Sequence, residues 1–258
     1  MLMNISFDDA LHTSYRHVLS MPSCCHTVYQ RFDFVVFAAV SLGLDHTLAL
    51  THDGAVWAAG LNTHGQVGIS MQRRMVLTKF AKVFPDGVKA VAAGGEHSML
   101  VNQDDSVWAI GRNANGQLGD DSNSDRDTCV QVVLGYTKAV ATGAKHSLVL
   151  MQDGSVWSVG CNLNGQLGDG SWQDRSRFFY VISGGADVVA AGSDYSMVLK
   201  QDGSVWVTGG NEYGQLGDGS TDLKRNFVQV IYSGSTAVAA GSRHSMVMKH
   251  DAQYGAEA

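Results

Sequence analysis

The fold is decided by the stretch Asp153-Gly-Ser-Val-Trp-Ser-Val-Gly-Cys-Asn-Leu-Asn-Gly-Gln-Leu-Gly168, which the chain contains in four copies. The other copies run over residues 53–68, 104–119 and 202–217. Their shared tryptophans lie 51, 49 and 49 residues apart, at Trp57, Trp108, Trp157 and Trp206. A fixed period of about fifty residues indicates a repeat protein, so the unit has to be interpreted before any single residue.

Each unit consists of three or four short apolar runs separated by Gly, Asp and Asn. In the second unit these runs cover residues 89–94, 96–101, 107–110 and 130–133. Runs this short and rich in Val and Trp predict β-strands, and no window shows the 3.6-residue period of a helix. Because they are apolar on successive residues, both faces should be covered, as between stacked propeller blades. We expect the Ala- and Gly-rich first strand to lie innermost, where blades converge, and Trp157 to be buried between blades.

The connections between the runs carry strong turn signals. Asp-Gly at 53–54, 153–154 and 202–203 predicts β-hairpins, with Asp105 in place of the glycine in the second unit. The loop Asn-x-x-Gly-Gln contains residue types that bond their own backbone and accept positive φ. Its glycines should have positive φ, or sit where a backbone approaches too closely for a Cβ. These structural glycines are Gly65, Gly116, Gly165 and Gly214.

On these motifs the chain resembles the regulator-of-chromosome-condensation repeat family. The matching patterns are Gly-x-x-His-Ser/Thr followed by apolar residues, and Asp-Gly-x-Val-Trp-x-x-Gly-x-Asn-x-x-Gly-Gln-Leu-Gly, over residues 38 to 250. The resemblance implies a β-propeller, usually of seven blades, that serves as a binding platform. Members of the family include exchange factors for a small GTPase, a plant ultraviolet photoreceptor and a bacterial β-lactamase inhibitor, so the fold does not choose a function.

The number of repeats departs from the family pattern. The chain has four tryptophan segments but five copies of the Gly-x-x-His/Tyr element, which begin at Gly43, Gly94, Gly143, Gly192 and Gly241. We therefore predict an all-β propeller of four full blades and an incomplete fifth, forming an open or partial ring. Strand edges near residues 34–50 and 235–250 would then favour self-association. The expected organisation is a non-repeat extension over 1–33, the propeller over 34–250 and a tail over 251–258.

Composition and charge limit the classes of partner and the cellular locations that we expect for this protein. The net charge of −6 disfavours a nucleic-acid surface, because phosphate contacts need concentrated Lys and Arg. No signal-peptide core or membrane-spanning stretch is present in the sequence, so we expect an intracellular protein, cytoplasmic or nuclear, without membrane contact. The four cysteines lack metal-type spacing and favour free thiols over a disulfide framework. They are Cys24, Cys25, Cys129 and Cys161.

Histidine recurs once per unit and could be mistaken for a metal cluster. Tyr195 takes the place of one copy, where a metal site would lose a ligand. We therefore interpret these histidines as structural, each hydrogen-bonded to the backbone of its own blade, and expect no metal or cofactor. Asp53, Asp153 and Asp202 are turn residues, so we expect no catalytic residues and no enzyme. The four histidines are His46, His97, His146 and His244.

The variable stretch after each Gly-Gln-Leu-Gly loop is where binding is expected, because loops on a repeated scaffold commonly carry function. Trp172 lies among arginines and phenylalanines, a composition typical of interaction hot spots. In the alternative, Trp172 folds onto its own blade edge and Phe178 or Phe179 belongs to the fourth strand. The candidate partner-binding residues are Arg73, Arg74, Trp172, Arg175, Arg177, Lys224 and Arg225.

The sequence favours a non-enzymatic scaffold that binds a partner protein through loops on one propeller face. The first alternative is a guanine-nucleotide exchange factor or regulator of a small GTPase, an activity that only the family resemblance implies. The second is a secreted inhibitor or adhesin-like propeller, which would need a signal sequence that is not seen here.

Overall fold

The computed structural model describes residues 35–69 and 76–250, and its regular structure there consists of β-strands. The eighteen strands are β1 (Phe37–Leu42), β2 (His46–Thr51), β3 (Val56–Leu61), β4 (Val76–Phe84), β5 (Val88–Ala93), β6 (His97–Asn102), β7 (Val107–Gly111), β8 (Arg126–Val133), β9 (Thr137–Thr142), β10 (His146–Met151), β11 (Val156–Gly160), β12 (Arg175–Ile182), β13 (Ala186–Ala191), β14 (Tyr195–Lys200), β15 (Val205–Gly209), β16 (Lys224–Ile231), β17 (Ser235–Ala240) and β18 (Ser245–Lys249). Within these ranges no helix is long and apolar enough to cross a membrane.

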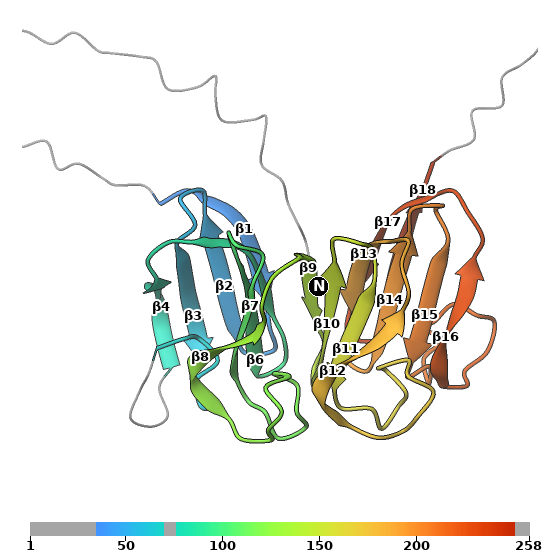
Figure 1. Ribbon diagram of the computed structural model, residues 1–258, viewed down its shortest axis with the longest axis horizontal. Coiled ribbons are helices and arrows are strands. Elements are labelled where there is room, and N and C mark those ends of the chain that lie inside the picture. Colours follow the sequence, from blue (N-terminus) through green and yellow to red (C-terminus); the bar gives the residue numbers. More distant parts are fainter. Residues whose placement is uncertain (1–34, 70–75, 251–258) are drawn as a thin grey trace, which may run out of the picture.

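The strands form blades, each an antiparallel sheet with its strands in chain order. Four sheets have four strands, from β1-β2-β3-β4 to β13-β14-β15-β16, and β17 pairs with β18 in a sheet of two. The first strands of neighbouring blades contact one another, as β5 does with β1 and β9. This confirms that the small-residue strands lie innermost. Figure 1 shows the blades following one another from β1–β4 at one end to β17–β18 at the other.

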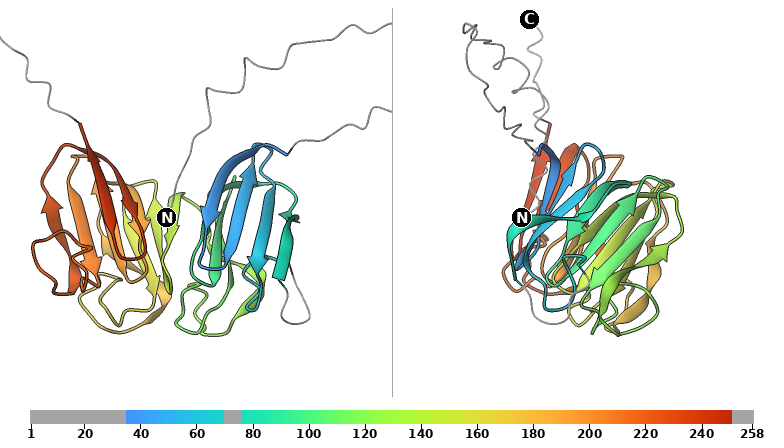
Figure 2. Two further views of the ribbon diagram at one scale, coloured as in Figure 1. Left: turned by 180° about the vertical axis from the view of Figure 1, so that it is seen from behind. Right: turned by 90° about the vertical axis from the view of Figure 1, so that its left-hand side faces the viewer.

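The ring is open over the part of the chain that the structure describes. The strand pairing joins neither β1 nor β4 to the two-stranded sheet. Seen from behind, the first blade and the last unit stand on opposite sides of the molecule (Figure 2, left). The prediction of four full blades and an incomplete fifth in an open ring is confirmed.

The outer strands begin earlier than the apolar runs indicate. The run at 130–133 predicts only the second half of β8, which starts at Arg126. Residues 126–129 are mostly polar and partly exposed. An outer strand has only one neighbouring strand, so its polar half can meet water while its backbone still pairs with β7. An apolar pattern therefore misses it.

The repeated tryptophan lies between blades, but it is only half-buried, so the prediction of a buried Trp157 was too strong. Its Nε1 donates to Ser155 Oγ at 3.2 Å, and its ring meets that of Tyr180 edge-on at 5.3 Å. Trp108 packs against the core of the first blade. The indole therefore fills the space between two neighbouring blades with one face and leaves part of its edge in water. The smaller residues further in, such as Leu148 and Val156, are fully buried.

Candidate protein-binding face

Each blade has two ends of different character. We name one end the long-loop face. It carries the loops between third and fourth strands, at residues 62–75, 112–125, 161–174 and 210–223, of which 70–75 lie outside the described residues. The turns between first and second strands lie at the same end. The long-loop face is the lower edge in Figure 1. The opposite end, here called the short-turn face, carries the hairpins between second and third strands.

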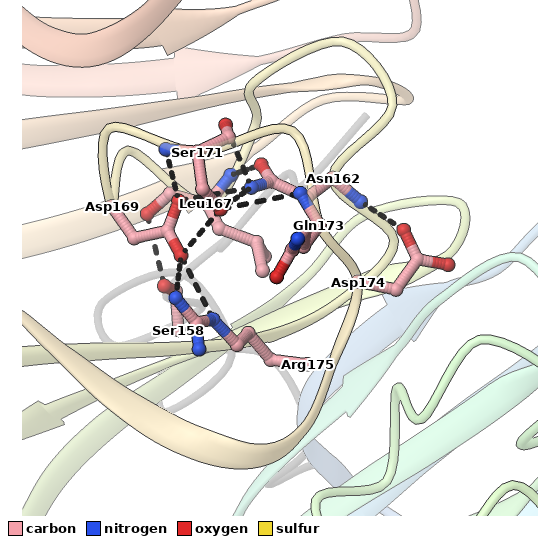
Figure 3. A network of polar contacts seen from close by, with 8 residues as sticks. All are labelled: Ser158, Asn162, Leu167, Asp169, Ser171, Gln173, Asp174 and Arg175. Carbon is pink, nitrogen blue, oxygen red and sulfur yellow. Dashed lines mark hydrogen bonds and ion pairs between the residues drawn. The ribbon is translucent and has the colours of Figure 1, made fainter.

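One asparagine fixes each of the long loops, as Asn162 does in the third blade (Figure 3). Its Oδ1 accepts from the Leu167 amide at 3.0 Å, and its Nδ2 donates to Asp169 Oδ1 and to the Ser171 carbonyl, both at 3.0 Å. Its own amide donates to Asp174 Oδ1 at 2.8 Å. Because Asn162 is fully buried, these bonds are not exchanged with water. Asn113 and Asn211 repeat the pattern in the blades on either side.

In the second, third and fourth blades a largely buried aspartate, paired with Arg or Lys, completes the network. Arg175 Nη2 lies 2.7 Å from Asp169 Oδ2, and the Asp169 side chain is fully buried. Burial alone would raise the pKa of Asp169, but hydrogen bonds from Ser171 and Arg175 hold it below its ordinary value. Lys224 lies 3.1 Å from Asp218 in the next blade, where the same balance lowers the pKa of Asp218 to about 2. Arg175 and Lys224 therefore stabilise their own loops, a role that the sequence analysis did not foresee.

The loop glycines join each blade to the next. Gly116 and Gly165 both have φ of +78°, and a Cβ on either would come within 3 Å of the outer strand that follows, at Ser176 and Arg225 respectively. Gly65 has φ of +83° and meets Asp127 in the same way. Gly214 also has a positive φ, of +71°, but a Cβ added there would meet no other atom within 4 Å. The structural prediction for these glycines is confirmed, and the long loops emerge as joints between blades.

The repeated histidine forms a second contact between blades at the first three joints. His97 Nε2 lies 2.9 Å from Ser147 Oγ in the next blade, and Ser147 Oγ donates to the Gln117 carbonyl at 2.8 Å. Since the serine proton is used on the carbonyl, Ser147 can only accept from the imidazole, and Nε2 carries the hydrogen. We call this chain of bonds a latch. The other two latches are His46–Ser98–Gln66 and His146–Ser196–Gln166.

The latches correct the prediction that each histidine bonds the backbone of its own blade. The blades converge here, so the imidazole Nε2 reaches the serine hydroxyl of the next blade. Burial lowers the pKa of His97 to about 3 and those of His46 and His146 to about 4, which keeps all three neutral. Across the next joint Tyr195 Oη donates to the His244 carbonyl at 2.5 Å, while the side chain of His244 is exposed in the last unit.

The predicted partner-binding residues fall into three groups. Arg73 and Arg74 lie outside the described residues. Arg175 and Lys224 are the internal ion-pair residues already described. Trp172 is 41% exposed, Arg225 is exposed, and the side chain of Arg177 is 77% exposed. Phe178 and Phe179 belong to β12, as one alternative had it.

Three exposed apolar residues on the long loops of the third and fourth blades were missed from sequence. Leu163 is 71% exposed, Tyr213 58% and Leu223 41%. Leu163 and Tyr213 occupy the variable positions inside Asn-x-x-Gly-Gln, where a large apolar residue has no structural task. A large apolar residue at such a position is the signal from which these exposed side chains could have been found. Arg243 lies over the Tyr213 ring with its guanidinium carbon 4.6 Å from the centroid.

This arrangement of blades, latches and asparagine-fixed loops is that of a repeat-built β-propeller. A family model described as the RCC1-like domain matches residues 16–255, and the chain belongs to that family. It is 38% identical over 90 residues to the ultraviolet-B receptor UVR8 of Arabidopsis thaliana. The aligned segment covers 34% of this chain and 20% of the receptor. It is 32% identical over 96 residues to the X-linked retinitis pigmentosa GTPase regulator of Mus musculus, covering 37% of this chain and 10% of the regulator.

The solved structure of Prp20p from Saccharomyces cerevisiae shares the fold. It superposes with a TM-score of 0.75 at 22% identity, covering 86% of this chain and 58% of Prp20p. The chain thus spans somewhat more than half of that structure and a fifth or less of the two relatives above.

Proposed function

We propose that this protein is a non-enzymatic scaffold that binds a partner protein through the long-loop face of its third and fourth blades. One observation carries the proposal: large apolar side chains are exposed there on loops that buried hydrogen bonds hold in place. They are Leu163, Trp172, Tyr213 and Leu223. Such a group on the surface is typical of an interaction site.

The rigidity of the loops favours binding. Asn162 and Asn211 fix the loops that carry these side chains, so little conformational entropy remains to be lost on association. Trp and Tyr, with Arg, are the residues most often found to dominate binding energy at interfaces. The exposed Arg225 and the stacked Arg243 supply the charged groups of such a site.

The titratable groups support binding rather than catalysis. Burial or hydrogen bonding shifts the pKa values of His97, Asp169 and Asp153, which serve a joint, a loop and a hairpin respectively. In the described part of the chain, no group of three or more His, Cys, Asp or Glu could hold a metal ion. The intracellular location expected from the sequence fits such a scaffold.

A photo-crosslinking amino acid at position 172 tests the proposal. The matched control places it at Tyr232, which is 79% exposed and precedes the inner strand β17 at the short-turn face. Cross-linking in the source cell should attach a defined partner at position 172 and not at 232. Equal labelling at both positions, or none at 172, would contradict the choice of face.

A second candidate is regulation of a small GTPase. It is favoured by the similarity to a GTPase regulator over about a third of the chain. The purified protein should then change the release of fluorescent GDP from at least one member of a panel of small GTPases. The Trp172→Ala variant should lose the effect. No change across the panel would remove this candidate and leave the scaffold proposal standing.

A further inference from the structure

A groove of about 360 Å³ lies between the outer strands of the second and third blades, and none of the apolar residues proposed above lines it. Its volume is within the range of roughly 300–1,000 Å³ usual for ligand sites. One wall comes from β8, the other from β12, and the preceding loop closes one end. The lining residues are Gly119, Asp120, Asp121, Val130, Gln131, Val132, Arg177 and Phe178.

The groove depends on residues that the third blade replaces. In register 49 residues further on, Val130 and Gln131 become Phe179 and Tyr180. The Tyr180 ring packs against Trp157, and the guanidinium carbon of Arg175 lies 4.5 Å from the Phe179 ring centroid. The repeat therefore tolerates large aromatic side chains at these positions. Gln131 pairs with Trp108, which packs on the first blade, so of these two residues only Val130 faces the groove and leaves space that the fold does not need.

Asp121 borders the groove and has a left-handed backbone conformation. It has φ of +63°, at the position where the next two blades have Gly170 and Gly219 with φ of +79° and +81°. A non-glycine residue is strained in this conformation. Its amide donates to the Ser176 carbonyl at 2.9 Å, which holds it at the joint. Aspartate accepts this conformation more readily than most residues, and Asp105 has the same one, with φ of +65°, in a hairpin turn.

The carboxylate of Asp121 is available to a ligand. Its Oδ2 lies 3.3 Å from Arg177 Nε, and the two side chains are 56% and 77% exposed. An exposed ion pair of this kind contributes little stability and exchanges readily with other charges. Asp120 is different, because its side chain is 2% exposed and paired with Arg126. Asp121 is thus the acidic group of the groove that can take a new partner.

We propose that this groove binds an extended segment of a partner protein. An aliphatic side chain of the segment enters between Val130, Val132 and Phe178, and a nearby Lys or Arg pairs with Asp121. β8 ends its sheet, so its outer edge can also bond the backbone of an extended segment. The net charge of −6 favours a basic segment over an acidic one.

Selection of ten-residue peptides from a displayed library on the wild-type protein tests this site. The enriched peptides should share an aliphatic residue with Lys or Arg within two positions. A labelled peptide from the selection is then measured by fluorescence anisotropy. The variant Val130→Phe fills the groove with the residue that β12 carries at the equivalent position, and should weaken binding by about tenfold or more.

Asp121→Gly separates a binding role from a structural one. It should raise the melting temperature, because the strain is removed, and yet weaken peptide binding by about tenfold. Asp187→Asn, which alters a comparable exposed ion pair with Lys138, should leave binding unchanged. The proposal is overturned if no peptide is enriched, if the groove-filling variant binds as well as wild type, if acidic peptides are selected, or if Asp121→Gly lowers the melting temperature.

Discussion

Mild acid should unfold this protein through its three histidine latches. In the folded state the pKa of His97 is about 3, and those of His46 and His146 are about 4. In the unfolded chain each is close to 6.5. Between these values the unfolded state binds more protons, so the latches contribute their full stability above about pH 6.5 and lose it as the pH falls toward 4.

The size of the effect follows from the same values. At pH 4.5 each histidine favours the unfolded state by about 2–3 kcal/mol, or roughly 7–8 kcal/mol for the three together. That is comparable with the whole stability of many domains. The lowered pKa of aspartates such as Asp169 acts in a different window, since their contribution is lost only below about pH 3.8.

Urea unfolding from pH 7 to pH 4.5 measures this directly. Between pH 5.5 and 4.5 the free energy of unfolding should fall by about 4 kcal/mol per pH unit, which corresponds to the uptake of about three protons. His97→Gln keeps a donor for Ser147 and should reduce the slope by about a third. His244→Gln is the control, because the exposed His244 side chain spans no joint. A slope of one proton or fewer, or one that His97→Gln leaves unchanged, would refute the assignment of these histidines as buried and neutral.

Three further predictions concern the joints. Ser147→Ala leaves His97 and the Gln117 carbonyl without their bridge and should cost about 2–3 kcal/mol in urea unfolding, whereas alanine at the exposed Ser183 should be neutral. Gly165→Ala should cost about 3 kcal/mol or more, since strain and a backbone clash combine, and Gly214→Ala only about 1 kcal/mol from strain; equal costs would contradict the close approach at Gly165. Trp157→Ala should cost roughly 2 kcal/mol, below the 3–5 kcal/mol of a fully buried aromatic, and an unchanged melting temperature would contradict its packing role.

The fold could be predicted because the same sequence pattern occurs in four copies. Tryptophan spacing, turn dipeptides and the small-residue strand each agree with one architecture, and the positive φ of Gly116 needs only local chemistry. The partner of His97 could not be predicted in this way. Its serine lies fifty residues away in the next blade, and nothing in one unit indicates how the units are stacked.

The candidate site was predicted less well, for a related reason. Composition alone does not separate an exposed arginine from one that is held internally. Arg175 and Arg177 differ by two positions, yet one neutralises a buried carboxylate and the other is mostly in water. Leu163 and Tyr213 were passed over because they lie inside a motif whose other members are structural.

Because each latch crosses a single joint, the arc is held together by nearest-neighbour coupling. An inner blade such as the third is supported on both sides, whereas the two-stranded unit β17–β18 is held through one joint, by Tyr195 and by the bond from Ser245 Oγ to the Gln215 carbonyl. Such a chain of units frays from its ends rather than melting as one body. Amide protons of β17 and β18 should therefore exchange with deuterium well before those of β10, and a partner seated over the last two blades would slow that exchange from outside.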